Sequence, residues 1–289
     1  MNIQDALDYG TRTLVAEHVE SPRLSTEVLL AHATGLSRAQ VLASREELAP
    51  PVESQFLDLI SRRARHEPVP YLTGEVEFFS IPLHITPGVL IPRPETETLV
   101  EAALAIARDL PDSPKIYDLC TGSGNIILAL AMHLEDGEFW ASDVSGLAIQ
   151  LAAKNIRRYR LENRIRLREG PLFNPIRAEL VRNFDLIVSN PPYVKSGDMN
   201  KLSPQVKDYE PRLALDGGRE GMNFYQSILD HAAPLLKPGG YILLEADPTL
   251  MAPIQAAVQR KRVFTEFSIL QDAAGKDRVC QFRLRVQGI

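Results

Sequence analysis

From Ile116 onward, short apolar runs alternate with segments of helical character, and this alternation limits the fold more than any other feature. Strand-like runs occupy residues 116–119, 139–142, 165–167, 184–188 and 241–245. Strands that alternate with helices pair in parallel, because each helix carries the chain back across the sheet. Runs at 265–270 and 278–286 predict a final antiparallel hairpin. We therefore expect an α/β fold built on a mainly parallel sheet.

The elements between these strands follow from the same patterns. Apolar residues at helical spacing predict a helix after Glu97, and further helices at residues 126–134, 147–159 and 224–236. Lys237-Pro238-Gly239-Gly240 is expected to form a turn before the fifth strand, since proline and glycine favour turns.

The N-terminal part has a different pattern and predicts a separate domain. Helices are expected to begin near Ile3, Pro22, Ser37 and Pro50, where apolar residues recur at helical spacing. A proline-rich stretch follows, in which 78–81 and 83–85 resemble two short strands of a hairpin. We therefore expect three parts, namely a helical domain at 1–73, a hairpin connector at 74–92 and the α/β domain at 93–289.

Composition excludes several protein classes. The 289 residues carry a net charge of -5, whereas duplex-binding proteins usually have a basic excess, so we expect no direct binding of nucleic acid. Two cysteines imply no disulfide framework and fit a reducing compartment. No signal peptide is recognisable, and no apolar run approaches the roughly 20 residues of a membrane helix. We therefore expect a cytoplasmic protein without membrane contact. We also expect a monomer, although composition does not bear on the oligomeric state.

A glycine-rich turn after the first strand and an acid after the second indicate a nucleoside-binding site. The turn consists of Cys120, Thr121, Gly122, Ser123 and Gly124. Asp143 follows Gly122 by 21 residues, close to the spacing of about 20 at which an acid accepts the ribose hydroxyls. Glycines in such a turn let the backbone approach the ligand closely.

The details of this turn favour S-adenosylmethionine as the ligand. The small third residue of a dinucleotide fingerprint is replaced by the bulky Ile127, and no Gly-Lys-Ser/Thr of a phosphate loop follows. S-adenosylmethionine needs a backbone turn and an acid but no phosphate cradle. The ligand of such a sheet lies at the switch point, beside the first and fourth strands.

The fourth strand ends in Asn190-Pro191-Pro192-Tyr193, a stiff corner that is rich in hydrogen-bond acceptors. The Asn190 side-chain oxygen and the Pro191 carbonyl can accept the two hydrogens of a planar –NH2 group, and the Tyr193 ring can cover its face. We expect Asn190, Pro191 and Tyr193 to be catalytic, and Asn190 to Tyr193 to bind the substrate. Asn190 also belongs to the predicted cofactor site.

The chemistry of this corner requires positioning more than proton transfer. An amide or aromatic amine nitrogen is a poor nucleophile, and two hydrogen bonds return electron density to it before it attacks a sulfonium methyl group. The proton can leave after transfer, so no strong general base is needed. His84, His133 and His231 are expected to be structural or surface residues, and no metal site is expected.

These features together resemble the peptide chain release factor glutamine methyltransferases of the HemK/PrmC type. The resemblance covers nearly the whole chain. Its motifs are Tyr71-Leu72-Thr73-Gly74, Ile91 to Glu97, Asp118 to Gly124, Asp143, Asn190 to Tyr193, Tyr209-Glu210-Pro211 and Ala274 to Arg278.

The resemblance implies a class I S-adenosylmethionine-dependent methyltransferase, with a Rossmann-like seven-stranded sheet and a small N-terminal helical domain that docks the substrate. It implies N5-methylation of the glutamine in the Gly-Gly-Gln motif of peptide chain release factors. Cys120 to Gly124 and Asp143 would bind the cofactor.

Several positions depart from the family pattern. Cys120 replaces the first glycine of the turn, so its backbone is expected to avoid positive φ. Pro171 and Leu172 stand where an acid and an aromatic residue often hold adenine, so Leu172 is expected to contact it. Tyr209 to Arg212 are expected to form part of a lid over the site.

Three alternatives remain open at this point. The substrate could be a glutamine of a ribosomal protein, which would use the same corner. It could be adenine N6 of nucleic acid, which would reach the pocket after base flipping. The chain could also bind the cofactor without catalysis.

Overall fold

The computed structural model describes residues 1–110, 112–175 and 180–286, which form two compact units. The first unit contains Met1–Glu75 and Ser203–Tyr209, and the second contains the remainder of the described chain. The functional boundaries expected at residues 73 and 92 stay predictions. In these ranges, no helix has the length and apolar character needed to cross a membrane.

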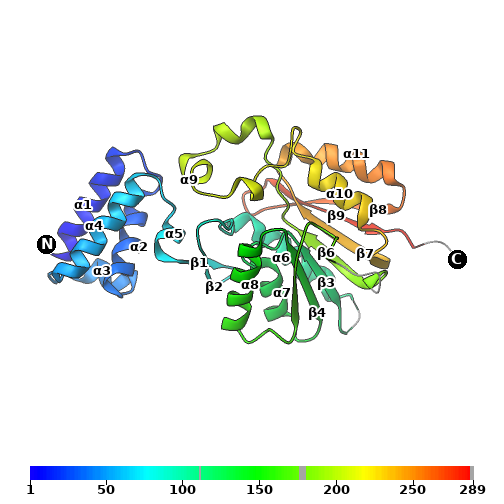
Figure 1. The fold of residues 1–289 in the computed structure, drawn as a ribbon, viewed down its shortest axis with the longest axis horizontal. Coiled ribbons are helices and arrows are strands. Elements are labelled where there is room, and N and C mark those ends of the chain that lie inside the picture. The colour runs from blue at the N-terminus through cyan, green and yellow to red at the C-terminus, as the bar shows by residue number, and fades with distance from the viewer. Residues whose placement is uncertain (111, 176–179, 287–289) are drawn as a thin grey trace. The chain divides into compact units, whose positions relative to one another are not determined.

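The elements follow one another as Figure 1 shows. The helices are α1 (Ile3–Ala16), α2 (Pro22–Thr34), α3 (Arg38–Ala43), α4 (Pro50–Ala64), α5 (Val69–Thr73), α6 (Glu97–Ala107), α7 (Asn125–His133), α8 (Gly146–Arg158), α9 (Pro204–Lys207), α10 (Asn223–His231) and α11 (Met251–Lys261). The strands are β1 (Glu75–Phe78), β2 (Ile81–His84), β3 (Lys115–Leu119), β4 (Glu138–Asp143), β5 (Ile165–Glu169), β6 (Phe184–Ser189), β7 (Leu236–Glu245), β8 (Phe264–Gln271) and β9 (Asp277–Leu284). Short 3-10 turns include η1 (Pro94–Thr96) and η3 (Ser196–Lys201).

The first unit is a helical bundle, and capping residues in the sequence determine where its helices begin and end. Gly35 adopts φ +71° and ends α2, as expected for a left-handed C-cap. Ser37 and Gln40 form a reciprocal capping box at the start of α3. At the end of α4, Arg63 is buried and donates hydrogen bonds to the carbonyl of Glu67 and to Gln205 of the segment 203–209. The Arg63 guanidinium therefore stabilises this unit internally.

The second unit carries a seven-stranded sheet in the order β5-β4-β3-β6-β7-β9-β8. Strands β3 to β7 pair in parallel, and β9 pairs antiparallel with both β7 and β8. The predicted fold class is thus confirmed. The strand order reverses between β3 and β6, so their carboxyl ends form the switch point at which ligands bind in open α/β sheets.

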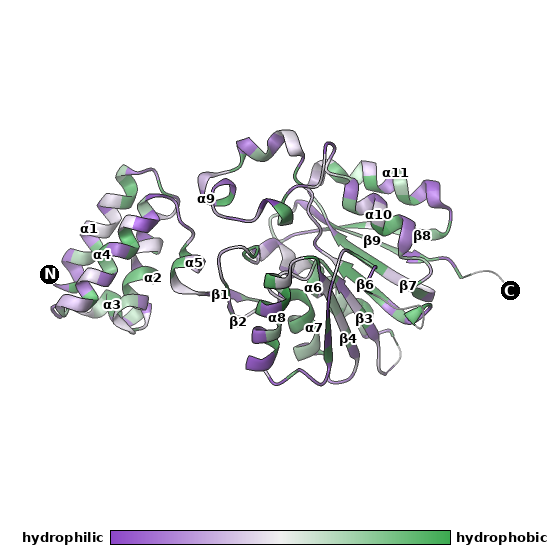
Figure 2. Cartoon of the chain, in the orientation of Figure 1, coloured by the Kyte–Doolittle hydropathy of each residue, from purple (hydrophilic) through white to green (hydrophobic). Residues whose placement is uncertain are grey.

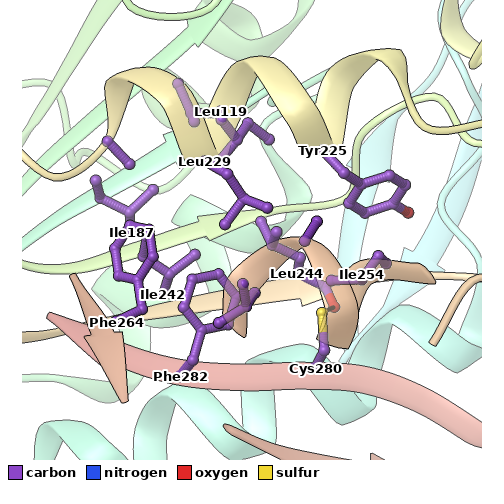
Figure 3. Packing of buried hydrophobic residues seen from close by; sticks show 14 of the residues in the cluster. Leu119, Ile187, Tyr225, Leu229, Ile242, Leu244, Ile254, Phe264, Cys280 and Phe282 are labelled. Carbon is purple, nitrogen blue, oxygen red and sulfur yellow. Dashed lines mark hydrogen bonds between the residues drawn. The ribbon is translucent and has the colours of Figure 1, made fainter. Parts of the chain in front are cut away.

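Side chains alternate along the central strands between two hydrophobic cores, one on each face of the sheet. On β3, Ile116 faces the core that includes α6 and α7, whereas Tyr117 and Leu119 face the core formed with α10 and α11. Figure 3 shows this second core, in which Ile242 and Leu244 of β7 pack together with Leu229 of α10. Figure 2 shows apolar strands covered by helices with mixed colouring, the pattern of a three-layer fold.

Three local expectations were wrong. The predicted turn 237–240 lies within β7, where a register shift opposite Phe184 accommodates Gly239 at φ +80°. The predicted helix 224–236 ends at His231 as α10, and α11 was not predicted. The hairpin strands lie a few residues from their expected places, because Phe79 and Ser80 form the two-residue turn with positive φ.

Candidate active site

A cavity of about 290 Å³ lies at the switch point, entirely within the second unit. The parallel register aligns Leu119 with Ser189, so the glycine-rich turn and Asn190 leave adjacent strands side by side. The predicted site residues that line the cavity are Cys120, Thr121, Gly122, Ser123, Asp143, Leu172, Asn190 and Pro192. Gly124, Pro191 and Tyr193 do not line it.

The glycine-rich turn is held from two directions. The Thr121 hydroxyl donates to the Asp118 carboxylate at 2.6 Å, and the Thr121 backbone N–H donates to the Ser142 carbonyl at 3.0 Å. Burial raises the pKa of Asp118 to about 7, and the hydrogen bond from Thr121 opposes this rise. Gly124 precedes α7 at φ +80°, and a Cβ there would lie 3.1 Å from the Ala152 Cβ, so a glycine permits the close packing with α8.

Cys120 contradicts the expectation for its backbone, because its φ is +59°. The left-handed conformation costs a non-glycine residue roughly 1–2 kcal/mol, and the surrounding turn maintains it here. Burial raises the pKa of the Cys120 thiol far above its usual range, with the nearby Asp143 and Asp118 adding to the effect. The thiol is therefore a neutral wall of the cavity.

Asp143 at the end of β4 joins the turn to the next loop. Its two carboxyl oxygens each accept one backbone N–H, from Gly122 and from Ser145, both at 2.9 Å. Burial raises the pKa of Asp143, and these hydrogen bonds oppose the shift. A carboxylate has about four acceptor positions, so acceptor capacity remains for hydroxyl groups of a ligand beyond the backbone N–H groups that it binds. A Cβ added to Gly122 would meet no atom of the described chain within 4 Å, so the backbone of this glycine is open to a ligand.

Asn190 is oriented by a contact that is distant in sequence. Its side-chain Nδ2 donates to the Thr96 Oγ1 at 3.1 Å, and Thr96 belongs to η1 of the Ile91 to Glu97 motif. The NH2 end of the amide is thereby directed at Thr96, and Oδ1, which has no hydrogen-bond partner in the described ranges, can accept a hydrogen bond in the cavity.

The loop after β6 supports the corner from behind. Val194 donates its N–H to the Leu215 carbonyl at 2.9 Å, and Gly217 donates to the Val194 carbonyl at 2.8 Å. A Cβ on Gly217 would lie 2.7 Å from the Tyr193 Cα, so only glycine fits this approach. The Tyr193 ring packs against the core that contains α10, and burial raises the pKa of its hydroxyl to about 12.

Two further segments line the cavity that motif spacing alone did not identify. They are 88–96, which supplies Val89, Leu90, Arg93 and Thr96, and 211–214, which supplies Pro211, Leu213 and Ala214. Glu210 joins them, because its buried carboxylate accepts the Ile91 N–H at 3.2 Å and forms an ion pair with Arg93. The sequence signals for these segments were the motifs Ile91 to Glu97 and Tyr209 to Pro211 of the family resemblance, which did not specify their contacts. Of the expected lid, Pro211 lies at the cavity, whereas Tyr209 belongs to the first unit and donates to the Arg65 carbonyl.

Comparison with known proteins supports the two-part organisation and the methyltransferase fold of the second unit. Residues 5–74 match the family model of the PrmC N-terminal domain, and residues 96–205 match that of the methyltransferase small domain. A methyltransferase from Pyrococcus furiosus shares the fold with a TM-score of 0.52 at 19% identity, over 73% of this chain and 91% of that chain.

Curated relatives match over almost the full length. The release factor glutamine methyltransferase of Moorella thermoacetica is 40% identical, over 96% of this chain and 97% of its own. The release factor glutamine methyltransferase of Geobacter sulfurreducens is 38% identical, over 98% of this chain and 96% of its own length. At this identity and coverage, the chain belongs to the release factor glutamine methyltransferase family.

Proposed function

We propose that this protein transfers a methyl group from S-adenosylmethionine to the side-chain amide nitrogen of the glutamine in the Gly-Gly-Gln motif of peptide chain release factors. The observation that carries the proposal is the Asn190 amide, whose NH2 end is bound to Thr96 and whose oxygen end has no hydrogen-bond partner among the described residues. The family membership supports the same reaction, since the named relatives are glutamine methyltransferases of release factors.

The residues at the cavity fit the proposed methyl donor. The turn from Cys120 to Gly124 would hold the methionine part through its backbone, and the Asp143 carboxylate would accept the ribose hydroxyls with its remaining lone pairs. Leu172 would contact the adenine. Bound S-adenosylmethionine supplies an electrophilic methyl group.

The corner at the end of β6 would hold the methyl acceptor. Asn190 Oδ1 would accept one N–H of the glutamine amide, and the carbonyl of Pro191, which stands between the lining residues Asn190 and Pro192, would accept the other. These two hydrogen bonds would hold the amide in place and increase the electron density on its nitrogen. Fixed acceptors act without reorganisation during the reaction, so positioning and electrostatics supply most of the acceleration. The proton leaves the nitrogen after methyl transfer, when that nitrogen is acidic.

The helical first unit would dock the protein substrate, and the segment 210–214 would cover the cavity. Pro211 and Leu213 support this second role because both line the cavity that contains Asn190. We infer that the enzyme acts as a monomer in the cytoplasm and needs no nucleic acid or metal.

Transfer of labelled methyl groups to three substrates in parallel tests the proposal. Unmodified release factor is expected to become labelled, whereas ribosomal protein and duplex DNA stay unlabelled. Labelled DNA would be consistent with the role of the Asn190 to Tyr193 corner but would reject release factor as the substrate. Cofactor binding without label on any substrate would favour a binding protein without catalysis.

A further inference from the structure

A buried carboxyl group behind the corner has no role in the chemistry described so far. Glu245 ends β7, its side chain is 1% exposed, and neither carboxyl oxygen has a hydrogen-bond partner of ordinary geometry among the described residues. Burial of a carboxyl group without full hydrogen bonding is strongly unfavourable. Such a group in a folded enzyme calls for an explanation.

The sheet brings Glu245 next to the catalytic corner. Ser189 of β6 pairs with Leu244 of β7 in parallel register, so Asn190 and Glu245 occupy the next positions of neighbouring strands. Thr96 links the two residues. Its hydroxyl accepts the Asn190 amide hydrogen at 3.1 Å. The same hydroxyl lowers the pKa of the Glu245 carboxyl, although the two groups do not meet at ordinary hydrogen-bond geometry in this structure.

The orientation of an asparagine amide is not fixed by a hydroxyl alone. A threonine hydroxyl both donates and accepts, so it can bind either the NH2 end or the oxygen end of Asn190. Only one of these orientations serves the reaction, because the other directs the NH2 group at the N–H groups of the substrate. An ionised carboxylate accepts hydrogen bonds but cannot donate them. If Glu245 takes the Thr96 hydrogen, the Thr96 oxygen can bind only the NH2 end of Asn190.

We propose that Thr96 and Glu245 are positioning residues, which fix the Asn190 amide with Oδ1 toward the methyl acceptor. The inference deepens the proposed function and rests on it. It also explains why a carboxyl group is buried behind the corner without lining the cavity.

The surroundings of Glu245 determine the pH at which its carboxyl group ionises. Burial raises the pKa of Glu245 to about 7, while the hydroxyl of Thr96 and the charge of Arg278 oppose the rise. The charged or titratable groups that act on Glu245 include Arg93 and Glu95 beside η1, Tyr193 after β6, Tyr225 of α10 and Arg278 of β9. Because only the ionised form is restricted to accepting, the fraction of correctly oriented Asn190 increases as the pH rises through about 7.

The test measures kcat, KM for release factor and Kd for S-adenosylmethionine in variants of the full chain. Thr96→Val keeps the side-chain shape and is expected to lower kcat about 10- to 100-fold, with Kd for the cofactor within about threefold. Thr96→Ser restores the hydroxyl and is expected to recover most of kcat. Glu245→Gln is expected to lower kcat and to abolish the rise of kcat between pH 6 and 8, because an amide can donate as well as accept.

Tyr225→Phe is the matched control. The buried Tyr225 hydroxyl donates to the backbone carbonyl of Glu245 at 2.7 Å, so this variant removes a hydrogen bond from the same residue without touching its carboxyl group. It is expected to lower thermal stability while kcat and its pH profile stay unchanged.

Several outcomes would overturn the inference. They are an unchanged kcat in Thr96→Val, equal losses in Thr96→Val and Thr96→Ser, or a loss confined to KM or to cofactor binding. A pH profile that is the same in Glu245→Gln and wild type would also overturn it. If wild-type protein does not methylate release factor at all, the proposed function fails first, so the two failures are distinguishable.

Discussion

Gly217→Ala is expected to displace the catalytic corner although residue 217 does not line the cavity. The added Cβ would lie 2.7 Å from the Tyr193 Cα and 2.8 Å from the Pro192 carbonyl oxygen. Carbon atoms in contact ordinarily lie about 3.5–4.0 Å apart, so one backbone segment must move by roughly 1 Å. Both neighbours are backbone atoms, and rotation of a side chain cannot relieve the overlap.

The expected magnitude has two parts. Overpacking of this kind costs about 1–3 kcal/mol, which corresponds to a decrease in Tm of roughly 2–12 °C for a domain of this size. A displacement of about 1 Å in the group that positions the substrate can lower the rate about 100-fold. We therefore expect a moderate loss of stability together with a severe loss of kcat.

Gly197→Ala provides the matched control for the Gly217 experiment. Gly197 lies in η3, and a Cβ at this position would meet no atom of the described residues within 4 Å. Thermal melting and methyl transfer to release factor are measured for both variants. If Gly217→Ala matches Gly197→Ala in Tm and kcat, the close approach does not support the corner and the reasoning is wrong.

Three further predictions concern the site itself. Asn190→Ala is expected to abolish methyl transfer while the Kd for S-adenosylmethionine stays within about threefold by calorimetry, since the acceptor for the substrate is lost; activity equal to wild type would reject the role of the corner. Cys120→Gly is expected to leave Tm within about 2 °C, because relief of strain at positive φ offsets the greater freedom of glycine in the unfolded chain, whereas the β-branched side chain of Cys120→Val should lower it. For Asp118, burial raises the folded-state pKa to about 7, above its unfolded value of about 4, so its contribution to stability falls as the pH rises between these values. Denaturant unfolding at pH 5 and pH 7 measures the free energy of unfolding, which should decrease less between these pH values in Asp118→Asn than in wild type. An equal decrease in the two proteins would refute this prediction.

The sequence predicted the parts of the fold that depend on local pattern. Alternating strands and helices predicted the parallel sheet, and the spacing from the glycine-rich turn placed Asp143 at the cavity. Gly35 and Ser37 marked helix ends, because capping depends on residues that are adjacent in the chain. These features need no knowledge of tertiary contacts.

The remainder depends on contacts between distant segments. Thr96 and Asn190 are 94 residues apart, and no periodicity relates them. Cys120 adopts positive φ because the turn between β3 and α7 imposes it, against the preference of the residue. Residues 237–240 form an irregularity within β7, because the register with β6 passes from Leu236 opposite Phe184 directly to Tyr241 opposite Leu186, and no local pattern predicts how two distant strands pair.

Mass spectrometry of release factor after incubation with the enzyme and S-adenosylmethionine tests the central claim most directly. Fragment ions locate the added methyl group, and the Asn190→Ala variant serves as the control. We predict one methyl group on the side-chain amide of the Gly-Gly-Gln glutamine, dependent on Asn190. Methylation at another residue, or at this glutamine in the Asn190→Ala sample to the same extent, would contradict the account.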